Sequence, residues 1–199
     1  MNFSVSDFKN FIGVIAVILV FIGYIPYIRD ILKEKTVPHI YSWFLWGFVT
    51  SIAFALQISD NAGVGSFVTL AAAIMCVAVV ALSLSKKGKR DITALDTFFL
   101  VLAFISLIIW LFAKQPVLSI ILTTLTDLLG FFPTIRKSWN KPFSETLSLY
   151  SLNTFRFALA IVALQHYSLL TALYPITWCV ANGLFACMLV LRRKEVAKL

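Results

Sequence analysis

Long runs of apolar residues, separated by short polar segments, dominate the pattern along the chain. A helix needs about 20 mostly apolar residues to cross the hydrocarbon core of a membrane. Seven runs approach or reach that length, at residues 10–29, 41–59, 64–85, 94–113, 116–136, 146–164 and 168–191. Charged residues, amides, glycine or proline fill the breaks between them. The pattern therefore predicts an all-α membrane protein with seven transmembrane helices.

The composition agrees with this class and excludes several others. Of the 199 residues, 60% are hydrophobic and only 13% are charged, which is more apolar surface than a lone soluble domain of this size can bury. Three cysteines are too few for a disulfide scaffold. The first apolar run lacks a basic flank with a short core and a small-residue cleavage site, so we expect a retained helix rather than a signal peptide.

The basic residues are distributed unequally between the two predicted sides of the membrane. The side that holds the N-terminus has Lys9 and Lys114, whereas the opposite side has 14 lysines and arginines. Cytoplasmic loops carry the excess of basic residues, so we expect an outside N-terminus and a cytoplasmic C-terminus in a multi-pass protein of the cell (inner) membrane. This bias and the anionic lipid of the bilayer explain the net charge of +8, so we expect no nucleic-acid partner.

The chain contains an internal repeat. Residues 23–29 read Gly-Tyr-Ile-Pro-Tyr-Ile-Arg, and residues 130–136 read Gly-Phe-Phe-Pro-Thr-Ile-Arg, 107 positions later. Residues 40–43 align with 149–152, and a third short match follows in the same order at an offset of 108. Because three crossings leave the chain on the opposite side, one linker helix is needed before a second copy can run in the same direction.

The predicted organisation is therefore a 3-1-3 arrangement of two parallel three-helix bundles. Residues 1–91 form the first repeat, residues 92–114 the linker helix, and residues 115–199 the second repeat. In transporters with parallel repeats, substrate sites lie near the bilayer midplane between the two units.

This arrangement resembles the SWEET and PQ-loop superfamily of seven-helix transporters, with this chain as a divergent member. The resemblance covers nearly the whole chain. In the PQ-loop pattern, Pro-Gln ends a helix and is followed by basic residues and a Ser-x-Glu-Gly-Leu-Ser-like segment. Here residues 132–137 read Phe-Pro-Thr-Ile-Arg-Lys, and residues 144–148 read Ser-Glu-Thr-Leu-Ser. Trp43 and Trp46 are similar to a Trp-x-x-Trp element of the related PnuC-like vitamin-precursor transporters.

The resemblance implies transport of a small polar metabolite but leaves its class open. Neither repeat has Gln after its Pro, and the third helix lacks the pocket Asn of sugar-carrying SWEETs, whereas the seventh has Asn182. Sugars, amino acids and vitamin precursors are therefore all candidate substrates, and sugar transport is one of the hypotheses for the function.

Pro26 and Pro133 are candidate hinges. Proline removes a backbone hydrogen bond inside a helix and clashes with the preceding turn. Its repetition in the two copies favours paired bending points for alternating access. The alternative is that both prolines simply end their helices, because basic residues follow within a few positions.

Asp127 and Arg156 are candidate substrate-binding residues, because charges inside apolar helices are costly. They are predicted to hold a polar or zwitterionic substrate, or Asp127 to titrate for proton coupling. The alternative is a structural ion pair between the two. Asn153 lies three positions before Arg156, shares its face, and is expected to orient it.

Trp178 and Asn182 share a face of the seventh helix, four positions apart, and suit a pocket that stacks and orients a small ring. The alternative is an interfacial Trp and an interhelical hydrogen bond. Trp46 is a further candidate for the pocket, whereas Trp43 is expected in the interfacial belt. Gln57 and Gln165 occupy equivalent outer ends, where lipid headgroups would suffice as partners.

The sequence thus predicts a transporter that works by alternating access between two helix bundles. The main alternative is a non-transporting membrane receptor or assembly factor with a SWEET-like fold. No phosphate loop, Ser/His/Asp set or metal-ligand spacing is present, so we expect no enzyme activity, cofactor or metal. The expected partners are a small-molecule substrate and the lipid bilayer; the sequence leaves open whether the chain forms a homo-oligomer.

Overall fold

The structure, a computed structural model, describes residues 4–34, 38, 40–85 and 94–196. All regular elements in this part of the chain are helical, which confirms the all-α prediction. They are α1 (Val5–Leu32), α2 (Ile40–Ser59), η1 (Gly63–Ser66), α3 (Phe67–Ser85), α4 (Ala94–Leu111), α5 (Pro116–Asn140), η2 (Pro142–Ser144), α6 (Leu147–Val162) and α7 (Leu169–Val196).

Several helices extend beyond the apolar runs that predict them. α1 begins at Val5 because Ser4 caps it: the Ser4 hydroxyl accepts a hydrogen bond from the Asp7 amide, and the Asp7 carboxylate accepts one from the Ser4 amide. α5 and α7 continue into polar residues at their C-terminal ends. An apolar run identifies only the part of a helix that suits lipid, whereas the backbone hydrogen bonds of the helix continue through the polar residues that follow.

Three stretches of helix are long and apolar enough to span a membrane, namely Val5–Leu32, Gly63–Ser85 and Leu169–Val196. Four shorter apolar helices accompany them, at Trp43–Ser59, Thr97–Leu111, Pro116–Phe131 and Leu147–Val162. Large apolar side chains are exposed along the outside of the bundle, among them Phe11, Ile18, Phe104, Ile108 and Leu184. Exposed apolar surface of this extent indicates a membrane protein.

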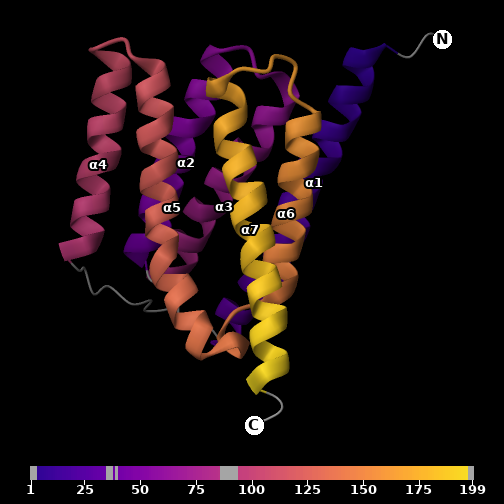
Figure 1. The fold of residues 1–199 in the computed structure, drawn as a ribbon, viewed down its shortest axis with the longest axis vertical. Coiled ribbons are helices and arrows are strands. Elements are labelled where there is room, and N and C mark those ends of the chain that lie inside the picture. Colours follow the sequence, from indigo (N-terminus) through magenta and orange to yellow (C-terminus); the bar gives the residue numbers. More distant parts are fainter. Residues whose placement is uncertain (1–3, 35–37, 39, 86–93, 197–199) are drawn as a thin grey trace.

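The helices run up and down in chain order between two ends (Figure 1). The N-terminus lies at the upper end in Figure 1 and the C-terminus at the lower end, and these names are kept below. α3 packs against both α1 and α2, and α7 packs in the same way against both α5 and α6. We call α1 to α3 the N-terminal half and α5 to α7 the C-terminal half.

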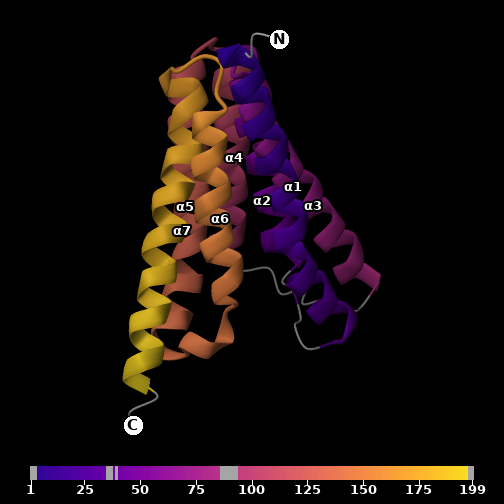
Figure 2. The same cartoon turned by 90° about the vertical axis from the view of Figure 1, so that its right-hand side faces the viewer.

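The two halves meet mainly where α1 packs on α6 and α2 packs on α5. Seen from the side, they touch at the upper end and diverge toward the lower end, like an inverted V (Figure 2). The helix backbones of the two halves therefore lie farther apart at the end that carries the C-terminus.

α4 is attached chiefly to α5. The buried Ser106 hydroxyl donates to the carbonyl of Ser119 over 2.9 Å, and the Ser119 hydroxyl donates back to the carbonyl of Ser106 over 2.7 Å. The Thr123 hydroxyl also contacts that of Ser106. Small residues with hydroxyl groups let membrane helices approach closely and bond to each other. α4 therefore packs as a neighbour of the C-terminal half.

Gly65 allows η1 to lie directly against α6 at the upper end. A Cβ atom at this position would lie 2.6 Å from the carbonyl oxygen of Ala160 and 2.9 Å from the amide nitrogen of Leu164. Both neighbours are backbone atoms of the other half, so they cannot turn aside as a side chain would.

We therefore expect Gly65→Ala to destabilise the fold by about 1–3 kcal/mol through overpacking. The measurement is the midpoint of thermal unfolding of the purified protein in detergent. Gly130→Ala is the matched control, because its Cβ would meet Trp46 Nε1 at an ordinary 3.5 Å. Equal midpoints for the two variants would show that this contact between the halves is loose.

Candidate functional site

A cavity of about 350 Å³ lies between the two halves. This volume falls in the range of sites that hold small molecules. Asp127 and Tyr174 line one part of it, and Pro38, Glu145 and Thr146, from the segments that join helices at the lower end, line another. The cavity therefore extends from the interior of the bundle to the end at which the halves diverge.

Matched positions of the two halves line this cavity. Every lining residue of the N-terminal half and of the segment that follows α1 has a lining counterpart 106 or 107 positions later. The pairs are Tyr24 and Phe131, Tyr27 and Thr134, Pro38 and Glu145, Trp43 and Tyr150, Trp46 and Asn153, Thr50 and Phe157, Ala72 and Trp178, and Cys76 and Asn182.

The lining also refines the register of the internal repeat. The sequence alignment places residues 40–43 on residues 149–152, whereas the cavity pairs Trp43 with Tyr150 and Trp46 with Asn153. The difference arises because the alignment matches identical letters, here a Tyr-Ser pair in each copy. The structure instead matches positions that face the same cavity, whatever residue they hold.

Asp127 is buried in α5 with one carboxylate oxygen bonded and the other unbonded. Its Oδ2 accepts hydrogen bonds from the Tyr174 hydroxyl and from Trp178 Nε1, each over 2.8 Å. The Tyr174 hydroxyl also contacts Thr50 Oγ1 of α2 at 3.1 Å, so this network joins the two halves. Oδ1 is buried and has no hydrogen-bond partner among the described residues. The side chain is 3% exposed.

Arg156 is buried in α6, and one of its buried guanidinium nitrogens also lacks a hydrogen-bond partner among the described residues. Its Nε donates to Asn153 Oδ1 over 2.8 Å, as the shared helix face predicts, and its guanidinium lies over the ring of Phe157. Nη1 is buried without a hydrogen-bond partner among the described residues. Asp127 and Arg156 do not form the alternative ion pair with each other, because each bonds to other side chains.

The equivalent positions of the N-terminal half are apolar. At the offsets of the cavity pairs, Asp127, Arg156 and Tyr174 correspond to Val20, Val49 and Val68, each 0% exposed. This half-bundle therefore packs with buried valines at positions where the other half holds an acid, a base and a phenol. The fold itself does not require polar groups there.

The six predicted substrate-binding residues, Asn182, Trp178, Asp127, Arg156, Asn153 and Trp46, all line the same cavity. Asn153 links two of them, because its Nδ2 donates to Asn182 Oδ1 over 3.3 Å while its Oδ1 holds Arg156. Asn182 Nδ2 donates to the Trp178 carbonyl over 2.7 Å. The structure thus brings the predicted residues together, and their role in binding remains a prediction.

The aromatic walls of the cavity contain residues that the sequence analysis missed. Trp43 is buried between Tyr24, Tyr27 and Trp46 rather than placed in an interfacial belt. Tyr24 and Tyr27 flank Pro26, so the repeated segment itself was the signal that could have identified them. Tyr174 carried no such signal, because it lies outside the repeated segments.

Neither candidate hinge ends its helix. α1 continues through Pro26 to Leu32, and α5 continues past Pro133 to Asn140. Pro175, which the sequence analysis passed over, lies inside α7 next to Tyr174. Proline inside a helix provides a local bending point, so the hinge interpretation of Pro26 and Pro133 stays a prediction compatible with the helix bounds.

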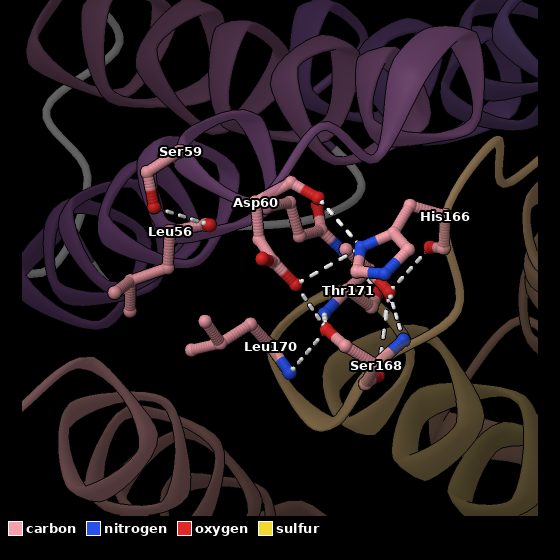
Figure 3. Close-up of polar contacts among 8 residues, drawn as sticks. Leu56, Ser59, Asp60, His166, Ser168, Leu170 and Thr171 are labelled. Atoms are coloured by element: carbon pink, nitrogen blue, oxygen red, sulfur yellow. Dashed lines mark hydrogen bonds and ion pairs between the residues drawn. The ribbon is translucent and has the colours of Figure 1, made fainter.

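A polar network connects the two halves at the upper end (Figure 3). Asp60, which follows α2, accepts a hydrogen bond from the Ser168 hydroxyl through its carboxylate. His166 Nδ1 lies 3.4 Å from the same carboxylate oxygen and 3.1 Å from the Asp60 carbonyl. The Thr171 hydroxyl donates to the His166 carbonyl over 2.8 Å. We call Asp60, His166, Ser168 and Thr171 the upper-end network.

Further bonds beside the upper-end network join the same segments. Gln57 Nε2 donates to the Thr171 carbonyl over 3.1 Å, and the backbone N–H of Gln165 donates to the Ala62 carbonyl over 2.9 Å. Lys9 Nζ donates to the Leu164 carbonyl over 2.7 Å. The buried Gln57 side chain therefore bonds to the other half rather than to lipid headgroups. The exposed Gln165 side chain donates from Nε2 to Asn10 Oδ1 of α1 over 3.0 Å.

The described residues contain no group of three or more His, Cys, Asp or Glu side chains arranged to hold a metal ion. Comparisons of the chain with protein-family models, with curated proteins and with solved structures found no match. The candidate site is therefore argued from its own geometry.

We expect Asp127→Asn to retain or raise the stability of the fold, whereas Asp127→Leu lowers it by about 1–3 kcal/mol. Asn keeps an oxygen for Tyr174 and Trp178 and removes a buried charge, whereas Leu leaves Trp178 Nε1 without its acceptor and leaves the Tyr174 hydroxyl with Thr50 alone. Thermal unfolding of the purified variants measures the difference. A large loss of stability in Asp127→Asn would show that the charge itself holds the fold together.

Proposed function

We propose that the protein is a membrane transporter that moves a small polar metabolite by alternating access between its two halves. The observation that carries this proposal is the cavity between the halves, with paired lining positions and buried polar groups. A receptor that holds a partner at its surface has no need of such an interior site.

The proposed architecture is a 3-1-3 arrangement of seven transmembrane helices, in which α1 to α3 and α5 to α7 are parallel repeats and α4 is the linker. The matched lining positions and the similar packing of α3 and α7 support this. This architecture is also what the resemblance to the SWEET and PQ-loop superfamily implies. In transporters with parallel repeats, one repeat moves against the other around a site near the midplane.

The proposed cycle starts from the arrangement seen in Figure 2, in which the halves join at the upper end and diverge at the lower end. The upper-end network closes one side of the membrane, and the cavity faces the other. Rocking of the halves, with bending at Pro26 and Pro133, would break this network and bring the lower ends together. The substrate would then face the upper side.

We propose that the lower end is cytoplasmic. Arg192, Arg193 and Lys194 lie in the last turns of α7 at this end, and Lys33 follows α1 there. Basic residues next to transmembrane helices are retained on the cytoplasmic side and meet anionic lipid there.

The test uses two single thiols in a background of Cys76→Ala, Cys179→Ser and Cys187→Ser. Ala62→Cys places a thiol at the closed upper end, where Ala62 is buried, and Leu149→Cys places one in the cavity. With a membrane-impermeant maleimide, we expect the thiol at position 149 to react from the cytoplasmic side. The thiol at position 62 should stay protected on the outer side.

Adding Asp60→Ala removes the carboxylate that holds Ser168 and His166. We expect it to speed labelling at position 62 several-fold and to slow labelling at position 149, because one end closes as the other opens. Ile58→Ala, an exposed substitution on the same helix end, is the control and should change neither rate. Rates that rise together, or that do not respond to Asp60→Ala, would contradict alternating access.

A further inference from the structure

The cavity wall carries two buried charges of opposite sign, and each retains an unused bonding atom. These are Oδ1 of Asp127 and Nη1 of Arg156. A buried charged group that lacks a partner is costly, and the valines at equivalent positions of the N-terminal half show that the fold does without such groups. The unused bonding capacity therefore points to a ligand.

The two charged side chains have separate hydrogen-bond partners. Tyr174 and Trp178 donate to Asp127, and Asn153 accepts from Arg156. A ligand that bonds both must present a cationic donor to the carboxylate and an anionic acceptor to the guanidinium. Both unused atoms are buried in this structure, so contact requires the two side chains to turn about their terminal torsions.

Both halves contribute aromatic side chains to the cavity wall. Trp43 and Trp46 of α2 lie edge to face with ring centroids 5.3 Å apart, and Phe131 and Trp178 of the other half lie 5.5 Å apart. Aromatic faces pack well against flat rings and attract cations. The combination suits a flat ligand whose ends carry opposite charges.

Resting on the proposed transport function, we propose that the substrate class is an aromatic zwitterion. Such a molecule has one ammonium group for Asp127, one carboxylate for Arg156, and a flat ring between the aromatic walls. A neutral sugar offers hydroxyl groups but compensates neither charge, and a ligand with a single charge compensates only one of them.

The test is isothermal titration calorimetry of the full-length purified protein with four probes. L-tryptophan carries both charges and a ring, tryptamine only the ammonium, indole-3-propionate only the carboxylate, and glucose neither charge. We expect tryptophan to bind at least tenfold more tightly than each of the other three, because only it pairs both buried charges.

Two substitutions assign the charges separately. Asp127→Asn should abolish the preference for tryptophan over indole-3-propionate, and Arg156→Gln should abolish the preference over tryptamine. Cys187→Ser, at an exposed position of α7 outside the cavity lining, is the control and should leave all affinities unchanged. The ranking of probes by the wild-type protein tests the proposal even where a variant does not fold.

The outcomes separate this inference from the proposed function. Glucose bound as tightly as tryptophan, or tryptophan no tighter than tryptamine, would overturn the zwitterion but leave alternating access intact. Binding of none of the four probes would overturn it as well. Absence of the reciprocal change in thiol labelling would instead overturn transport, whatever the probes bind.

Discussion

The closure between the two halves at the upper end is the contact on which the rest of the arrangement depends. Gly65 packs on the backbone of α6, and Asp60, Ser168 and His166 bond across the same region (Figure 3). The backbones of the halves lie close together there and farther apart below (Figure 2). The cavity lies between the halves and is lined by residues of both.

Within this arrangement, equivalent positions of the two halves hold side chains of different chemistry. Two of the paired lining positions are aromatic in both halves, Tyr24 with Phe131 and Trp43 with Tyr150. In contrast, Asp127 and Arg156 of the C-terminal half stand in place of the buried Val20 and Val49. Under the proposed function, charges in only one of the two halves suit a ligand whose two ends differ. The bonds that Tyr174 makes to Asp127 and Thr50 also connect the site to both halves.

The sequence was sufficient for the helical class, for the approximate positions of the helices, and for six residues that the structure gathers around one cavity. Apolar runs and isolated polar residues inside them have a direct physical cause, so they can be identified without coordinates. The correspondence between positions of α2 and positions of α6 in the repeat could not be found in this way, because the sequence alignment relied on identical residues. Trp43 and Gln57 were misplaced for a related reason, since burial against the opposite half depends on tertiary packing.

The measurement that tests the central claim most directly is the distance across the lower end, between spin labels at Ser85→Cys of α3 and Lys194→Cys of α7. Both positions are exposed and lie in opposite halves. In a background of Cys76→Ala, Cys179→Ser and Cys187→Ser, we expect pulsed electron spin resonance to give a long distance while Asp60 is present. A growing population at shorter distance is expected once Asp60→Ala weakens the upper end. A single unchanged distance under both conditions would show that the halves do not move against each other.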